Sequence, residues 1–175
     1  MNKNYPIYKT TFIDDMRSLV EEAAQNFTDS IAISYKENYW DKEVCKVSFN
    51  QWRDDVRHLG TALIASGLRE EKIAILGENS YGWCCSFFAV MGIGSVTVPV
   101  DKELPIEDID GIITTTSCKA VIYGKTAEEK IKELLMDGAV GEIMNIQTSE
   151  RVGAFHSSVS YIRGKWNSTK ECNSS

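Results

Sequence analysis

The chain has 175 residues, of which 43% are hydrophobic and 25% are charged, and its formal net charge is -6. This length and composition fit one globular domain and exclude an intrinsically disordered protein. The acidic balance, without a clustered basic face, argues against nucleic acid as the main partner.

The amino-terminal part predicts a helix followed by a hairpin. The opening stretch MNKNYPIYKTTFIDD lacks the apolar core of a secretory signal, so we expect a cytoplasmic protein. Thr11 can cap a helix through about Asn26, with acidic residues in its first turn. Its apolar residues recur every three or four positions: Phe12, Met16, Leu19, Val20, Ala23 and Phe27. Two strands follow, Ile31 to Tyr35 and Val44 to Phe49, joined by turn-forming residues as in an antiparallel hairpin.

The next segment, roughly Asn50 to Ser66, predicts an amphipathic helix. One face carries Trp52, Val56, Leu59 and Leu63. Gly67 suits the left-handed conformation that often follows the last helical residue.

The central stretch, residues 72–101, predicts a strand, a helix and a parallel strand. Ile73 to Leu76 is a short apolar run, Ser80 to Met91 fits a buried helix that Asn79 or Ser80 can cap, and Ser95 to Val100 is rich in β-branched residues. Strands joined by a crossover helix lie parallel. Residues 81–100 carry no charge and could span a bilayer, but their glycines, their proline and the strand chemistry of the last third favour a buried unit of a soluble protein.

The remaining segments continue the alternation of helix and strand. Pro105 fits a first helical position, with Glu107 and Asp108 beside the positive end of the helix dipole. A strand (119–123), a helix (126–136) and a last strand (142–146) follow. The pattern predicts an α/β fold with a mostly parallel sheet flanked by helices and an added antiparallel hairpin. We expect one domain over residues 1–147 and an irregular or disordered tail over residues 148–175, which is rich in Ser, Asn and Gly.

The sequence predicts no catalytic, cofactor-binding or metal-binding residue in this chain. His58 lies on a polar helix face and His156 in the tail, so neither indicates a nucleophilic triad. Gly77 and Gly82 flank the turn after the first core strand but complete no phosphate-binding motif. A ligand crevice at the strand ends stays open as an alternative.

Several other polar or aromatic groups have structural explanations. The run from Thr114 to Ser117 fits helix-end capping or strand packing better than phosphate binding. Trp52 and Trp83 are predicted core anchors before ligand platforms. The acidic pairs Asp14–Asp15 and Glu107–Asp108 are expected in the first turns of helices or on polar faces. The five cysteines lack metal-ligand spacing and are expected as small buried thiols: Cys45, Cys84, Cys85, Cys118 and Cys172.

Three segments together resemble the amino-terminal part of AMP-forming acyl-CoA synthetases, in the adenylate-forming superfamily. They are AILGENSYGW, FFAVMGIGSVTVPVD and LPIEDIDGIITTTSCKAVIY. The resemblance covers roughly residues 11–146 and is greatest to the long-chain fatty acid branch. Glu78, Asn79 and Trp83 match the family's strand-to-helix turn, while Gly94, Pro99 and Asp101 match the following strand and its exit.

The resemblance implies a parent enzyme that activates a carboxylic acid with ATP and magnesium and transfers the acyl group to coenzyme A. The family's phosphate loop, its Tyr-Gly-x-Thr-Glu motif, its ribose-binding aspartate, its hinge and its catalytic lysine are not found in this chain. We therefore expect a truncated, frame-altered or deliberately cut amino-terminal fragment that is inactive alone. Such a fragment is expected to expose the apolar face on which the missing part of the parent would dock. Its expected partners are the remainder of the parent or a second copy bound through this exposed docking face.

Two other classes remain open. A free-standing α/β binding or regulatory module would have that docking face covered, as a stable monomer or homodimer. An unrecognised small enzyme would need a perturbed acid or base in a cleft, for which the sequence offers no candidate.

Overall fold

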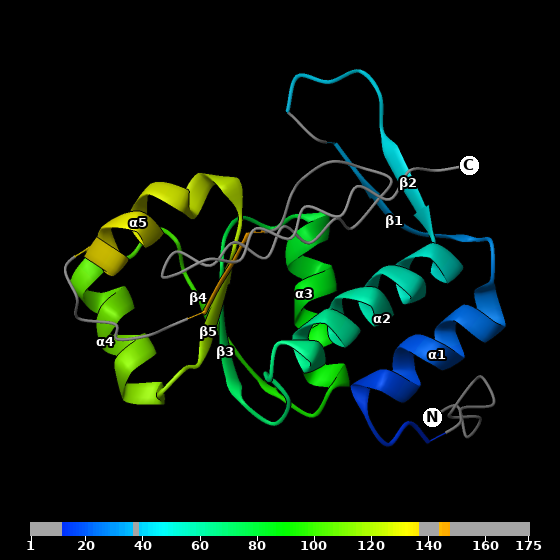
Figure 1. The fold of residues 1–175 in the computed structure, drawn as a ribbon. Coiled ribbons are helices and arrows are strands. Elements are labelled where there is room, and N and C mark those ends of the chain that lie inside the picture. Colours follow the sequence, from blue (N-terminus) through cyan, green and yellow to red (C-terminus); the bar gives the residue numbers. More distant parts are fainter. Residues whose placement is uncertain (1–11, 37–38, 137–143, 148–175) are drawn as a thin grey trace, which may run out of the picture.

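A computed structural model describes residues 12–36, 39–136 and 144–147. Within these residues the chain forms three layers (Figure 1): helices α1 to α3 on one side, a parallel sheet in the middle, and helices α4 and α5 on the other side. The expected α/β fold, with a mostly parallel sheet and an added hairpin, is confirmed.

Helix α1 (Met16–Phe27) starts later than the sequence predicts. Thr11 lies outside the described residues, and the cap is Asp15, whose extended backbone lets its carboxylate accept from the Ser18 N–H at 2.6 Å. Asp14 and Asp15 therefore precede the helix instead of filling its first turn, which corrects the predicted start. A carboxylate is a strong acceptor at the positive end of a helix, and this hydrogen bond lowers the pKa of Asp15.

Strands β1 (Ile31–Tyr35) and β2 (Cys45–Ser48) form the predicted antiparallel hairpin, with a register shift between Ile31 and Ile33. Helix α2 (Phe49–Ala65) follows at once because the Ser48 hydroxyl accepts from the Gln51 N–H at 3.2 Å. Gly67 adopts φ +78° just past the helix, as predicted.

The central unit is confirmed as β3 (Lys72–Leu76), α3 (Tyr81–Gly92) and β4 (Val96–Val100), with the two strands parallel. Ser80, one of the two predicted caps, accepts from the Trp83 N–H at 3.1 Å. None of the described helices has the length and apolar character needed to cross a bilayer.

Helix α4 (Ile106–Thr116) begins one residue after Pro105, which takes the position before the helix instead of the predicted first helical position. Glu107 and Asp108 lie in its first turn, as expected. Strand β5 (Ala120–Tyr123) leads into a 3-10 turn, η1 (Lys125–Ala127), and then α5 (Glu128–Met136), so the predicted helix start at Thr126 falls in the 3-10 turn.

The last described strand, β6 (Met144–Gln147), pairs in parallel with β5. Residues 142–143 of the predicted strand, and the predicted tail from residue 148, lie outside the described part of the chain.

Strand residues alternate between two cores, one on each face of the sheet. Ile73, Ala120 and Ile122 pack with α2 and α3 residues such as Leu59 and Val90. The opposite face packs with α4 and α5 through Ala74, Leu76, Val121 and Tyr123. A strand buried on both faces has no polar alternation, which explains the continuous apolar runs of β3 and β5.

Candidate functional site

The sheet has the strand order β4-β3-β5-β6, so its order reverses between β3 and β5. From β3 the chain leaves towards α3 on one face, and from β5 it leaves towards α5 on the other face. The loops that follow β3 and β5, called the exit loops below, therefore start side by side and lead to opposite faces of the sheet. Open α/β sheets bind ligands at such a crevice, outside the carboxyl ends of the strands.

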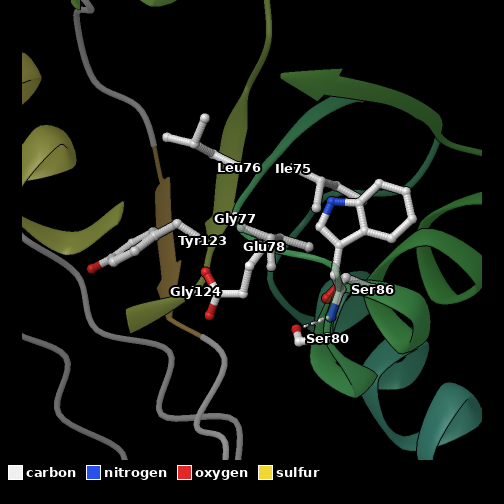
Figure 2. Close-up of a pocket in the computed structure, with 10 residues that line it drawn as sticks. Ile75, Leu76, Gly77, Glu78, Ser80, Ser86, Tyr123 and Gly124 are labelled. Carbon is white, nitrogen blue, oxygen red and sulfur yellow. Dashed lines mark hydrogen bonds between the residues drawn. The ribbon is translucent and has the colours of Figure 1, made fainter. Parts of the chain in front are cut away.

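A small pocket lies at this point (Figure 2). Side chains from both strands and from α3 surround it, and the lining residues are Ile75, Leu76, Gly77, Glu78, Ser80, Trp83, Ser86, Ile122, Tyr123 and Gly124. Its volume is about 10 Å³, close to the space that one water molecule needs. The crevice left open by the sequence therefore exists, but a nucleotide does not fit in it.

Two glycines bring the exit loops together and narrow the pocket. A Cβ atom added to Gly77 would lie 3.2 Å from the backbone nitrogen of Gly124. The Gly124 N–H donates to the carbonyl of Leu76 at 3.0 Å, which continues the sheet past the end of β3. Glycine at position 77 thus permits the close packing of the two loop backbones.

Glu78 joins the same two loops through its side chain. Its carboxylate accepts a hydrogen bond from the hydroxyl of Thr126, and it lies close enough to Gly124 that a Cβ there would meet both carboxylate oxygens at 3.4 Å. This contact spans 48 residues of sequence. A carboxylate at this point repels phosphate, which is a second reason why the pocket does not fit ATP.

Trp83 forms the α3 wall of the pocket. It is half-buried and stacks on Phe87, with ring centroids 5.5 Å apart and planes 16° apart. Trp52, in contrast, is 7% exposed and packs edge-on against Phe88, so its predicted role as a core anchor is confirmed. Trp83 lies at the pocket and not in the core, so its predicted role as a core anchor is wrong.

Charges of both signs lie at the carboxyl edge of the sheet. The ammonium group of Lys102 contacts Glu103 and lies near Glu78, and both carboxylates raise its pKa, Glu103 the more strongly. Lys130 reaches from α5 to the carbonyl groups of Lys102 and Leu104 and so holds the loop after β4. These cations already have partners within the chain, so they form no open anion site.

A second polar cluster joins α2 and α3 away from the pocket. The Tyr81 hydroxyl donates to Asp55 Oδ2 at 2.6 Å, and Tyr35 stacks on the Tyr81 ring at 5.3 Å. Burial raises the pKa of Asp55, of Tyr81 and of the adjacent Cys85 thiol. A thiol with a raised pKa stays protonated near neutral pH, so Cys85 lacks the thiolate that nucleophilic chemistry needs.

The other residues singled out in the sequence do not converge on the pocket. His58 is exposed on α2, as predicted, and His156 lies outside the described residues. Thr114 to Thr116 end α4, where the Thr116 hydroxyl donates to the Ile112 carbonyl at 2.6 Å, which confirms the structural interpretation.

The cysteines and possible metal ligands of the described residues are spread over several elements. Cys85 and Cys118 are buried as expected, Cys45 and Cys84 are only half-buried, and all four are free thiols, while Cys172 lies outside the described residues. Within the described ranges, no three His, Cys, Asp or Glu residues lie close enough together to hold a metal ion. The sequence pattern gave no sign of the contact between Glu78 and Thr126, because nothing local pairs residues so far apart.

The chain is similar to known proteins over most of its length. The sequence model of the AMP-binding enzyme family matches residues 20–169. The hybrid PKS-NRPS synthetase mycA of Thermothelomyces thermophilus is 29% identical over 108 residues, which are 59% of this chain and 3% of that protein. The long-chain-fatty-acid–CoA ligase FadD13 of Mycobacterium tuberculosis is 30% identical over 80 residues, 45% of this chain and 16% of that protein.

Solved structures share the fold. A Mycobacterium tuberculosis fatty acyl CoA synthetase superposes with a TM-score of 0.67 at 19% identity, covering 78% of this chain and 27% of that one. The chain thus spans less than a fifth of FadD13 and about a quarter of the synthetase of known structure.

Proposed function

The chain belongs to the AMP-binding enzyme family, and from this premise we propose that it is the amino-terminal subdomain of an AMP-forming acyl-CoA synthetase. The parent enzyme would activate a carboxylic acid of the fatty acid class with ATP and magnesium and form the coenzyme A thioester. The family match over residues 20–169 is the observation that carries the proposal. The relatives include both a hybrid PKS-NRPS synthetase and a fatty acid ligase, and the resemblance of the central segments to the fatty acid branch favours the second.

We further propose that this chain has no activity alone. The phosphate loop, the Tyr-Gly-x-Thr-Glu motif and the catalytic lysine that the family uses do not occur in its 175 residues. The pocket at the strand ends supports this proposal because it has room for about one water molecule and is lined by the Glu78 carboxylate.

The proposed partner is the remainder of the parent enzyme, and its docking face is formed by α3 and β4. Helix α3 carries no charged residue from Tyr81 to Gly92, yet Trp83 and Phe87 are only half-buried. Val96, on the edge strand β4, is 55% exposed. A helix that is apolar all round is normally buried, so a further layer of protein is expected to cover this side.

The boundary at residue 147 and the cytoplasmic location remain proposals. Strand β6 ends at Gln147, and the family match continues to residue 169, so part of the segment after residue 147 belongs to the matched region.

The experiment is a pyrophosphate-release assay with ATP, magnesium, a fatty acid and coenzyme A, beside calorimetric titration of the same ligands. FadD13 of Mycobacterium tuberculosis serves as the positive control. We expect no pyrophosphate and no heat with ATP from this chain. Pyrophosphate release, or heat with ATP, would show a phosphate site without the usual loop and would refute the proposal of an inactive subdomain.

A second measurement distinguishes the subdomain hypothesis from the free-standing module. It measures the binding of an apolar dye to the same sample, beside sedimentation. Dye binding that Val96→Ser weakens supports an uncovered α3–β4 face. Absence of dye binding would favour the module, because its apolar face would already be covered.

A further inference from the structure

Strand β4 forms an edge of the sheet, because among the described strands it pairs only with β3. An edge strand exposes a row of backbone N–H and C=O groups, to which another strand can add. The sequence of β4, VTVPV, is uncharged and rich in β-branched residues, so its composition favours such pairing. An edge of this kind pairs with other chains unless some feature protects it.

The hydrogen bonds of β4 determine which of its backbone groups point outward. The Val96 N–H donates to the Glu71 carbonyl at 2.9 Å, so it points towards β3. Strands β3 and β4 stay in register along their whole length. Backbone groups alternate in direction along a strand, so Val98 also faces β3. The backbone nitrogens of Thr97 and Pro99 therefore point to the outer edge.

The outer edge of β4 offers few donors to an added strand. Proline has no N–H, and its ring occupies the space where a carbonyl of that strand would lie. Just before β4, the Ser95 N–H already donates to the Val90 carbonyl at 3.1 Å. Thr97 is thus the one outward residue of the strand that keeps an N–H, whereas a regular ladder needs a donor at every second residue.

Other common forms of edge protection are missing from β4. Edges are often protected by charged side chains, by bulges or by a covering element. None of the residues of β4 is charged, and its pairing with β3 has no bulge. Val96 is 55% exposed and Pro99 is exposed as well. Among the described residues, Pro99 is therefore the feature that prevents a strand from adding here.

We propose that Pro99 closes the outer edge of β4 to strand addition, so that a partner contacts this side of the molecule through side chains. A helix meets this requirement, because it satisfies its own backbone hydrogen bonds and needs none from β4. The resemblance to the synthetases rests in part on Pro99, yet the pocket does not include this residue. The kind of partner rests on the proposed function, whereas the closure of the edge concerns this chain alone and is tested without it.

The first test is amide hydrogen exchange in the unchanged chain, followed by NMR. The Val98 N–H is bonded to β3 and the Thr97 N–H faces outward, so Thr97 should exchange at least about a hundredfold faster. Comparable exchange rates for the two amides would show that a strand already covers this edge, which would overturn the proposal.

The second test restores the missing donor with Pro99→Val, which keeps the residue apolar and adds an N–H at the outer edge. Pairing of two copies through β4 then gains one hydrogen bond from each, so the association constant should rise at least about tenfold in sedimentation equilibrium. Pro105→Ala is the matched control. It also removes a proline, but Pro105 precedes α4 outside the sheet, and its carbonyl still accepts from the Ile109 N–H.

A double variant, Thr97→Pro with Pro99→Val, moves the proline to the other outward position. It loses no hydrogen bond to β3 and closes the edge again, so its association should return to that of the unchanged chain. Circular dichroism of each variant must match the unchanged chain, and the exchange measurement decides if Pro99→Val does not fold. No rise with folded Pro99→Val, an equal rise with Pro105→Ala, or a rise that persists in the double variant would overturn the proposal.

Discussion

Replacing Ile122 by alanine tests whether the face of the sheet under α3 is the main core. Ile122 is 1% exposed in β5, between β3 and β6, and its side chain belongs to the core shared with α2 and α3. The substitution removes three carbon atoms, which at about 0.8 kcal/mol each lowers the free energy of unfolding by about 2.4 kcal/mol. The cavity left behind adds about 1 kcal/mol, and not more, because the site borders the small pocket and can partly fill from it.

The matched control is Ile64→Ala on α2. Ile64 is 46% exposed, so removing its three carbon atoms forfeits only about half of the burial free energy worked out for Ile122. The higher helix propensity of alanine offsets about 0.4 kcal/mol of this loss. We expect a loss below about 1 kcal/mol for the control and about 3.4 kcal/mol for Ile122→Ala. The conservative change Ile122→Val should fall between them, near 1 kcal/mol.

The assay is urea denaturation followed by circular dichroism and tryptophan fluorescence. With a slope of about 1 to 3 kcal/mol per molar urea, Ile122→Ala should lower the midpoint by more than about 1 M. Equal losses for Ile122→Ala and Ile64→Ala would refute the assignment of this face of β5 to the core under α3.

Three further predictions concern glycines, a half-buried carboxylate and a helix cap. Gly111→Ala in α4 should raise the free energy of unfolding by about 1 kcal/mol, because open space surrounds its Cβ position. Gly77→Ala should lower the free energy of unfolding, since the new Cβ meets backbone at 3.2 Å. A change of the same sign for both variants in urea denaturation would contradict this glycine geometry. Burial raises the folded-state pKa of Asp55 above its ordinary 3.8, so stability should fall as the pH rises from 3.8 through the raised value. Asp55→Asn, which can still accept from Tyr81, should remove that part of the pH dependence of the melting temperature, and an unchanged pH profile would count against it. Ser80→Ala should cost about 1 kcal/mol through loss of the α3 cap, whereas Ser80→Thr should cost much less; equal losses in urea denaturation would mean that the hydroxyl does not cap the helix.

The helices, the strands and their types followed from the sequence because the interactions that set them act over a few residues. The apolar spacing of α2, the capping hydroxyl of Ser80 and the left-handed Gly67 all lie within the segments they organise. The first turn of α1 was misplaced because Thr11 and Asp15 are both good caps, and only the backbone conformation of Asp15 decided between them.

The family also followed from the sequence, since three segments of the chain resemble AMP-forming synthetases and the AMP-binding family matches the region that contains them. The sequence left open whether a crevice exists at the strand ends. Its position depends on strand order, and the sequence alone does not tell that β5 pairs with β3 instead of β4.

Only the tertiary structure decided where the two hollows in the surface lie. The two exit loops meet at the pocket because Gly77 and Gly124, 47 positions apart, approach closely, and a surface groove lies where α1, α2 and the end of α3 meet. Such contacts arise from the packing of whole elements, in which many weak interactions act together across the chain. Periodicity and capping determine each element, but the pairing of distant loops has no local signal, so it became visible only in the fold.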